Sequence, residues 1–186
     1  MLLKELHNVP LFEGKETFYH GSNTKIEKFT DKFLDRPGAT NQEGPGIYLT
    51  TAAQDARVYG KVIHTVEAKI VKSKLLPAGA KTPEFAIRTL IQKAPDSDLI
   101  LTDWDEDPKK ALIKAVSGIL EFNRNDYREA LEQVWADFYR GESAAFLAIL
   151  RNWNYQGFKL NRADGVTHFI CWDPSILTIK NIEEIK

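Results

Sequence analysis

The chain has very little sulfur and no long apolar run. Cys171 is the only cysteine in 186 residues, which excludes an internal disulfide and a zinc site built from several cysteines. No segment approaches the roughly 20 apolar residues that a membrane-spanning helix needs. The opening segment, MLLKELHNVPLFEGKETF, has acidic residues and a proline where a secretory signal has an unbroken apolar run. We therefore expect a cytoplasmic protein with no membrane partner.

An excess of charge of one sign is also missing. The 25 lysines and arginines are balanced by 26 aspartates and glutamates, so the net charge is −1 and gives no bulk electrostatic reason to bind nucleic acid. His7 and His64 belong to no set with metal-ligand spacing, and the acidic run TDWDEDP lacks the glycine and terminal glutamate of a calcium loop. We predict no metal site, and we expect His64 to be a core residue on the apolar face of its strand.

Length and hydrophobic pattern indicate one α+β domain over residues 1–186. Strands and turns are expected at 17–71, helices at 83–153, and strands again at 157–182. The segment KVIHTVEAKIV alternates apolar and polar residues with the period of a half-buried strand. The final segment, GFKLNRADGVTHFICWDPSILTIKNI, is typical of three strands joined by an Asp-Gly turn and a proline turn. The C-terminal strands are therefore expected to complete the sheet.

Apolar spacing divides the helical block into several helices. One is expected between Pro83 and Pro95, and a second has Pro108 in its first turn. A third follows NRND, where Asn125 or Asp126 can cap it, and Gly141 separates it from a fourth. The block is therefore predicted to be helical throughout.

Two segments have the composition of a ligand site. FYHGSNT places His20, Gly21 and Ser22 at the end of a strand, where a glycine permits close approach to the backbone and a serine hydroxyl can donate and accept; it is equally an ordinary turn. In GPGIYLTTAAQDARVYG, a strand is followed by a helix expected to run to Tyr59, with Thr51 and Gln54 as its capping box. Tyr48 and Tyr59 can then converge on a slot for a flat ring, although both also suit a core with hydroxyls at the surface.

These segments, together with THFICWDPSILTI, resemble the three-part signature of the ADP-ribosyltransferases, in the branch of the poly-ADP-ribose polymerases and their phage and bacterial relatives. The resemblance implies a split β-sheet, mixed or antiparallel, with the helical block inserted at about 83–153. It also implies NAD as co-substrate. His20 would contact the adenosine-side ribose, Gly21 and Ser22 would hold the carboxamide, and Tyr48 and Tyr59 would stack on the nicotinamide ring.

The third motif departs from the family, because His168 stands where the catalytic glutamate is expected. A carboxylate stabilises an oxocarbenium-like transition state, whereas imidazolium would oppose its charge. Asp164 can supply a carboxylate from the preceding loop, although Asp-Gly is also a common turn.

The resemblance implies a mono-ADP-ribosyltransferase acting on a macromolecular acceptor, a protein rather than a nucleic acid, with His20, Tyr48, His168 and Asp164 in the catalytic site. The histidine keeps open a binding or protein-interaction module without catalysis, and the same pocket would serve NAD hydrolysis.

Overall fold

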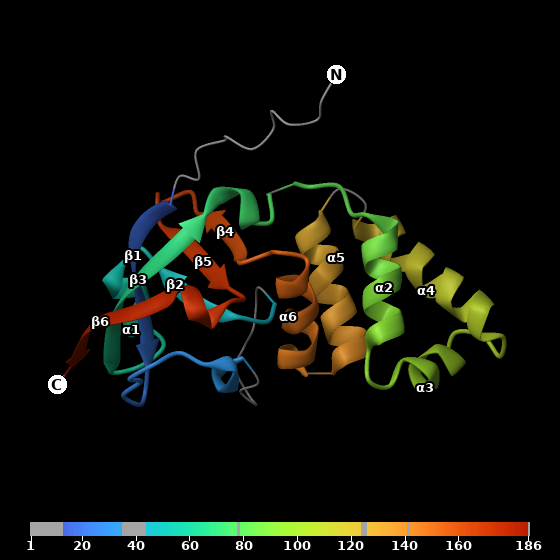
Figure 1. Ribbon diagram of the computed structural model, residues 1–186, viewed down its shortest axis with the longest axis horizontal. Helices are drawn as coiled ribbons and strands as arrows, with labels where there is room; N and C mark the ends of the chain where they lie inside the picture. Colours follow the sequence, from blue (N-terminus) through green and yellow to red (C-terminus); the bar gives the residue numbers. More distant parts are fainter. Residues whose placement is uncertain (1–12, 35–43, 78, 124–125, 141, 186) are drawn as a thin grey trace, which may run out of the picture.

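A computed structural model describes residues 13–34, 44–77, 79–123, 126–140 and 142–185 (Figure 1). Within these residues one sheet has the strand order β4-β5-β2-β1-β3-β6, and every neighbouring pair is antiparallel. The strands are β1 (Glu13–Ser22), β2 (Ile47–Thr50), β3 (Val62–Val71), β4 (Gly157–Asn161), β5 (Thr167–Cys171) and β6 (Leu177–Glu184). The predicted α+β class is confirmed, and the C-terminal strands occupy both edges of the sheet.

The sheet consists of two three-stranded halves joined at a narrow seam. β1 pairs with β3 over its full length, from Glu13 to Ser22, but the register between β1 and β2 contains the single pair Tyr19 and Thr50. β5 and β2 then continue the second half through four residue pairs. The predicted split sheet is therefore present in its antiparallel form.

The alternation that predicts a strand over 61–71 corresponds to β3. Val66, Ala68 and Ile70 are buried on one face, and Lys69 is exposed between them. Ile63 is also buried, which the alternating pattern does not predict. Ile63 pairs with Gly21 of β1, and the short helix α1 (Ala53–Arg57), between β2 and β3, packs against Gly21 on this second face of the sheet. Both faces of β3 are therefore covered at this end.

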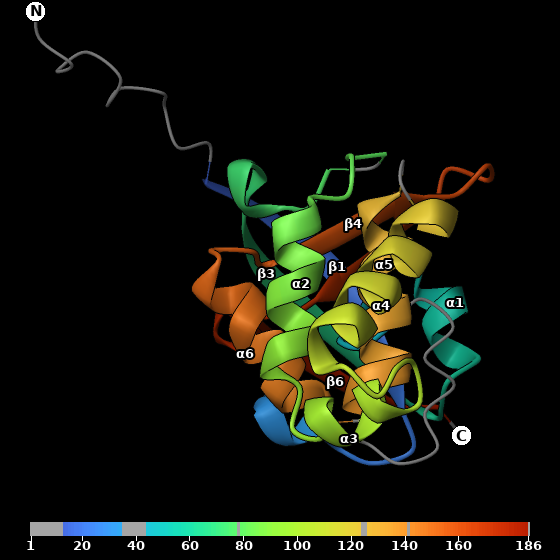
Figure 2. The same ribbon diagram turned by 90° about the vertical axis from the view of Figure 1, so that its right-hand side faces the viewer.

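The inserted helical block is confirmed; its helices run from Glu84 to Asn152, and it lies beside the sheet with α5 and α6 nearest to it (Figures 1 and 2). Its elements are α2 (Glu84–Lys93), α3 (Ser97–Thr102), α4 (Pro108–Asn123), α5 (Tyr127–Val134), a π-helical turn (Trp135–Tyr139) and α6 (Ser143–Asn152). Short 3-10 turns lie at Asp31–Phe33, Lys72–Lys74 and Pro174–Ile176.

Local chemistry explains where these helices begin. α4 begins at Pro108, whose missing N–H is not needed in a first turn, and the Asp107 carboxylate accepts from the Lys109 N–H at 2.9 Å. α5 is capped by Asp126, whose carboxylate accepts from the Glu129 N–H at 3.1 Å. The other proposed cap, Asn125, the separator Gly141, and His7 all lie outside the described residues.

The sheet and the helical block share one continuous apolar core. Trp172 lies at their junction, where its indole N–H donates to the Pro45 carbonyl at 3.1 Å and its ring packs edge-on against Tyr155. Across the same junction, the Arg128 guanidinium lies 5.9 Å from the centre of the Phe158 ring. No helix in the described ranges has the length and apolar character needed to span a bilayer.

Candidate functional site

The three sequence motifs lie on three adjacent strands. Tyr19, in the first motif and directly before His20, pairs with Thr50 at the end of β2, and Thr50 pairs on its other side with His168 of β5. Opposed residues in antiparallel strands project from the same face of a sheet. Tyr19, Thr50 and His168 therefore lie side by side at one end of the seam, on the face that α1 covers, whereas the side chain of His20 projects from the opposite face, toward His64 and Phe29.

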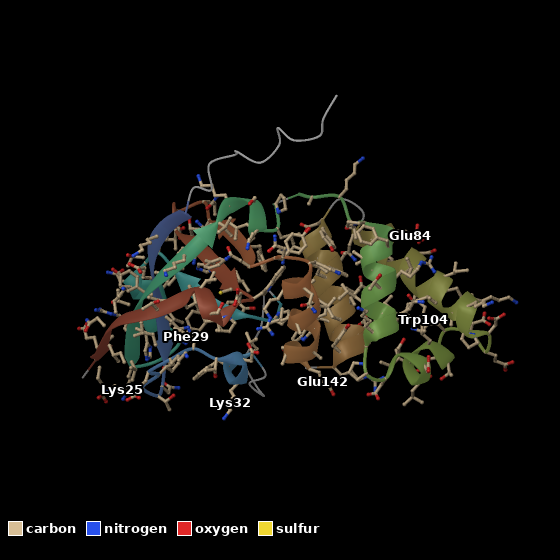
Figure 3. All side chains as sticks on the ribbon, in the orientation of Figure 1. Lys25, Phe29, Lys32, Glu84, Trp104 and Glu142 are labelled. Atoms are coloured by element: carbon tan, nitrogen blue, oxygen red, sulfur yellow. The ribbon has the colours of Figure 1, made fainter. Side chains whose placement is uncertain are left out.

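His20 joins β1 to β2 at this point. Its Nδ1 lies 2.8 Å from the Tyr48 carbonyl oxygen, and because a carbonyl only accepts, Nδ1 carries the proton and donates. The ring also packs edge-on against Phe29, whose centre lies at 5.2 Å, in the sheet half of the molecule (Figure 3). The orientation of His20 is therefore fixed by one strand and one aromatic ring.

His64 supports His20 from β3 and is fully buried, as predicted for a core residue. Its Nε2 accepts from the Ile26 N–H at 2.9 Å, and its Nδ1 donates to the His20 carbonyl at 3.2 Å. These bonds select the neutral Nδ1–H tautomer. Burial lowers the pKa of His64 below its usual 6.5, against a smaller opposing effect from the bond to His20.

Ser22 is buried, and its hydroxyl is used within its own turn. The hydroxyl donates to the Thr24 carbonyl and accepts from the Thr24 N–H at 3.3 Å. This is the local Ser/Thr turn that competes with other hydrogen-bonding roles. The structure thus gives Ser22 a local part in ending β1, and its contact with a carboxamide stays a prediction.

Gly21 is required for the approach of α1. A Cβ placed on Gly21 would lie 1.7 Å from the Ala56 carbonyl oxygen and 3.3 Å from the Cβ of Tyr59. Gly60 completes this contact, because its own Cβ would lie 2.1 Å from the Ser22 carbonyl oxygen. On this face the backbone of β1 is covered by protein, so the freedom that glycine gives is used by the helix.

The predicted capping box of α1 is wrong. The helix begins after Ala52 with no side-chain cap, because the Thr51 hydroxyl instead accepts from the Thr167 N–H at 2.9 Å. It also ends at Arg57, so Tyr59 follows the helix and does not belong to its last turn. Tyr59 is 56% exposed and begins directly over Gly21. It is therefore accessible to a ligand at the seam.

Tyr48 contacts the glycine-containing segment that precedes β2. Its hydroxyl donates to the Gly44 carbonyl, and Gly44 and Gly46 have φ values of 85° and 147° that other residues rarely adopt. The ring is half-buried against the core. Stacking of Tyr48 and Tyr59 on a nicotinamide ring stays a prediction.

The carboxylate beside His168 belongs to Asp55 of α1. The Asp55 Oδ2 lies 3.5 Å from His168 Nε2 and 3.1 Å from a guanidinium nitrogen of Arg162. Arg162 also pairs with Asp164 at 2.9 Å, and the other oxygen of Asp164 accepts from the Val166 N–H at 3.0 Å. Asp164 thus helps to build its own turn, and its catalytic role stays a prediction.

Sequence reasoning did not single out Asp55. An aspartate in AQDAR has the pattern of an ordinary exposed helix residue, and its partner is more than a hundred residues away in the chain. The one available signal is its position beside Ala56, in a helix whose small residues indicate close packing. No group of three or more histidine, cysteine, aspartate or glutamate side chains within the described ranges could hold a metal ion.

Comparisons with known proteins show only distant similarity. No protein-family model and no curated protein matches the chain. A crystal structure of an anti-CRISPR protein is similar with a TM-score of 0.37 and 17% identity, covering 95% of this chain and 99% of the other. The toxin–antitoxin complex MbcT–MbcA of M. tuberculosis contains a chain with a TM-score of 0.41 and 16% identity, covering 94% of this chain and 86% of the other. These similarities are too weak to assign an activity.

Proposed function

We propose that the protein binds NAD at the seam of the sheet and transfers one ADP-ribose unit to a macromolecular acceptor. The observation that carries the proposal is the meeting of the three motifs through the pairs Tyr19–Thr50 and Thr50–His168. Strand pairing brings these segments, which are far apart in the chain and each resemble one part of an ADP-ribosyltransferase signature, to adjacent positions, as a shared ligand site requires.

Several side chains suit the parts of NAD. The exposed ring of Tyr59 offers an apolar face on which nicotinamide would lie. His20, oriented by the Tyr48 carbonyl, lies at the end of β1, and the ribose contact assigned to it would be reached from the face of the sheet opposite to α1. His168 approaches from β5, on the other side of the seam. We assign Tyr48 and Tyr59 to ring binding, and His20 and His168 to the two riboses.

In the proposed reaction the bond between the ribose C1′ and the nicotinamide nitrogen breaks, and its electron pair neutralises the positive ring. A lone pair of the acceptor forms the new bond to C1′, and the acceptor proton leaves to solvent. Positive charge develops on the ribose between these events. A preorganised group that stabilises such charge is commonly worth about 10²–10³ in rate, so the residues around His168 decide how fast the reaction is.

One observation favours a second function, binding of NAD or ADP-ribose without cleavage. The position of the family's glutamate is occupied by His168, and an imidazole lacks the fixed negative charge of a carboxylate. A protein of this kind would retain Tyr48 and Tyr59 for ring binding but would not turn NAD over. NAD hydrolysis, with water as the acceptor, is the third outcome that the same site allows.

The three functions are distinguished by incubating the protein with adenylate-labelled NAD and a cell lysate. We expect label on a protein band, with a mass increase of one ADP-ribose unit and no polymer. Label in the nucleic-acid fraction would change the acceptor class, while free ADP-ribose alone would indicate hydrolysis. NAD binding without any cleavage would support the binding module, and the absence of both would refute the proposal.

A matched pair of variants tests the location of the site. Tyr59→Ala removes the exposed ring over Gly21, and we expect it to weaken NAD binding about tenfold or more, in line with the loss of an aromatic stacking partner worth about 1–3 kcal/mol. Val58→Ala is the control, because Val58 is adjacent and 83% exposed but has no assigned role. Equal binding by both variants would place the site elsewhere.

A further inference from the structure

The third motif has no carboxylate at position 168, but a negative charge is present nearby on another element. Asp55 lies in α1, and its Oδ2 is 3.5 Å from His168 Nε2. Both side chains are shielded from solvent, with 29% of Asp55 and 14% of His168 exposed. At this burial a charge acts over several ångströms with less screening than on an open surface.

The packing of α1 sets where this charge lies. The carbonyl of Ala56, the next residue, covers Gly21, and Tyr59 begins over the same glycine. Asp55 therefore contacts the third motif on β5 and precedes by four residues the exposed tyrosine that we assign to ring binding. A ribose attached to a ring on Tyr59 and facing His168 would lie close to the Asp55 carboxylate.

The neighbouring ion pairs leave a net negative charge. Arg162 neutralises one carboxylate, but it is shared between Asp55, at 3.1 Å, and Asp164, at 2.9 Å. Two carboxylates and one guanidinium sum to −1 when His168 is neutral, which is the formal charge of one glutamate. Arg162 and Asp164 are each 48% exposed, whereas Asp55 is the more shielded of the two carboxylates. The Asp55 carboxylate, which lies beside His168, is thus less screened by solvent than the Asp164 carboxylate.

We propose that Asp55 supplies, through its contact with His168, the negative charge that stabilises the ribose cation during NAD cleavage. The inference rests on the proposed function and adds a residue to it. Asp55 forms no bond with the substrate in this scheme. It is a positioning residue that holds the His168 ring and keeps the local charge negative, which explains how a histidine can occupy the third motif of a site that still cleaves NAD.

The test is steady-state NAD cleavage by the full-length protein and Asp55→Asn. The amide keeps the size of the side chain and removes its charge, so we expect kcat to fall at least tenfold while KM for NAD changes less than threefold. Asp31→Asn is the matched control: it also breaks a carboxylate–arginine pair, at 2.7 Å to Arg151, but lies outside the site. It should retain wild-type kcat.

A second substitution that restores the charge distinguishes a loss of charge from a loss of folding in Asp55→Asn. Introducing His168→Glu into Asp55→Asn restores a carboxylate at the position of the family's glutamate, and we expect kcat to recover at least fivefold over the single variant. Circular dichroism and the melting temperature of Asp55→Asn establish that it is folded. A loss of kcat without rescue, or a loss confined to KM, would show that Asp55 acts only by holding α1 in place.

Failure of the inference is distinct from failure of the proposed function. If the wild-type protein cleaves NAD and Asp55→Asn retains its kcat, the inference is overturned and the proposed function stands. The inference also fails if Asp164→Asn loses activity and Asp55→Asn does not, since the charge would then come from the turn. A wild-type protein that binds NAD without cleaving it overturns both the inference and the proposed transfer, and one that does not bind NAD overturns the NAD site itself.

Discussion

Replacing Gly21 by alanine should displace α1 and destabilise the fold. The new Cβ would lie 1.7 Å from the Ala56 carbonyl oxygen, whereas real Cβ atoms stay at least 3.0 Å from such a neighbour. The helix must therefore withdraw by about 1.3 Å, and because the obstacle is backbone, no side-chain rotation can relieve it. Overpacking of this kind costs about 1–3 kcal/mol of unfolding free energy.

Urea denaturation followed by circular dichroism measures this cost. With an m-value of about 2 kcal/mol/M, a loss of 2 kcal/mol moves the midpoint down by about 1 M. Gly14→Ala is the control on the same strand, since its nearest neighbouring atom is 4.0 Å away. We expect that control to be neutral or stabilised by up to about 1 kcal/mol, because alanine loses less entropy than glycine. Equal midpoints for the two variants would refute the close packing of α1 on β1.

Two further predictions concern stability. The pKa of His64 is lowered by folding, so the unfolded chain binds the proton more tightly; the stabilisation is complete above the unfolded value of 6.5 and is lost as the pH falls below it. Between pH 7.5 and 5.5 the urea midpoint should fall less in a folded His64→Gln variant than in the wild type. An equal fall in both proteins would contradict this. Asp126→Ala removes the N-cap of α5 and should cost about 1 kcal/mol, measured by the same assay. Asp137→Ala is its exposed control, and equal losses would rule out a capping effect.

Periodic segments are the part of the fold that sequence predicts well. The alternation over β3 and the apolar stripes of the helical block reflect burial on one face, and each stripe must meet a core whatever the topology. Turn chemistry is equally local, as the cap at Asp126 and the turn that contains Asp164 show. These features therefore follow from short stretches of chain.

The site is predicted less completely, because its contacts join distant segments. Thr51 has the sequence of a helix cap, but its hydroxyl accepts from the N–H of Thr167, which no local pattern indicates. Gly21 was expected to admit a ligand, and on the α1 face it admits Ala56. Asp55 gains its significance only from the β2–β5 register that brings His168 to it. Tertiary packing, and not local propensity, decides each of these roles.

The bond from His20 to the Tyr48 carbonyl has a mechanical consequence. Among the residues that the structure describes, the strand register between the two half-sheets contains the pair Tyr19 and Thr50, and this side-chain hydrogen bond at 2.8 Å is a further link beside it. His20 therefore links the two half-sheets and is also a candidate ligand-binding residue. A His20 variant that loses activity would need its half-sheet alignment verified, for example by amide exchange along β2, before the loss is attributed to chemistry.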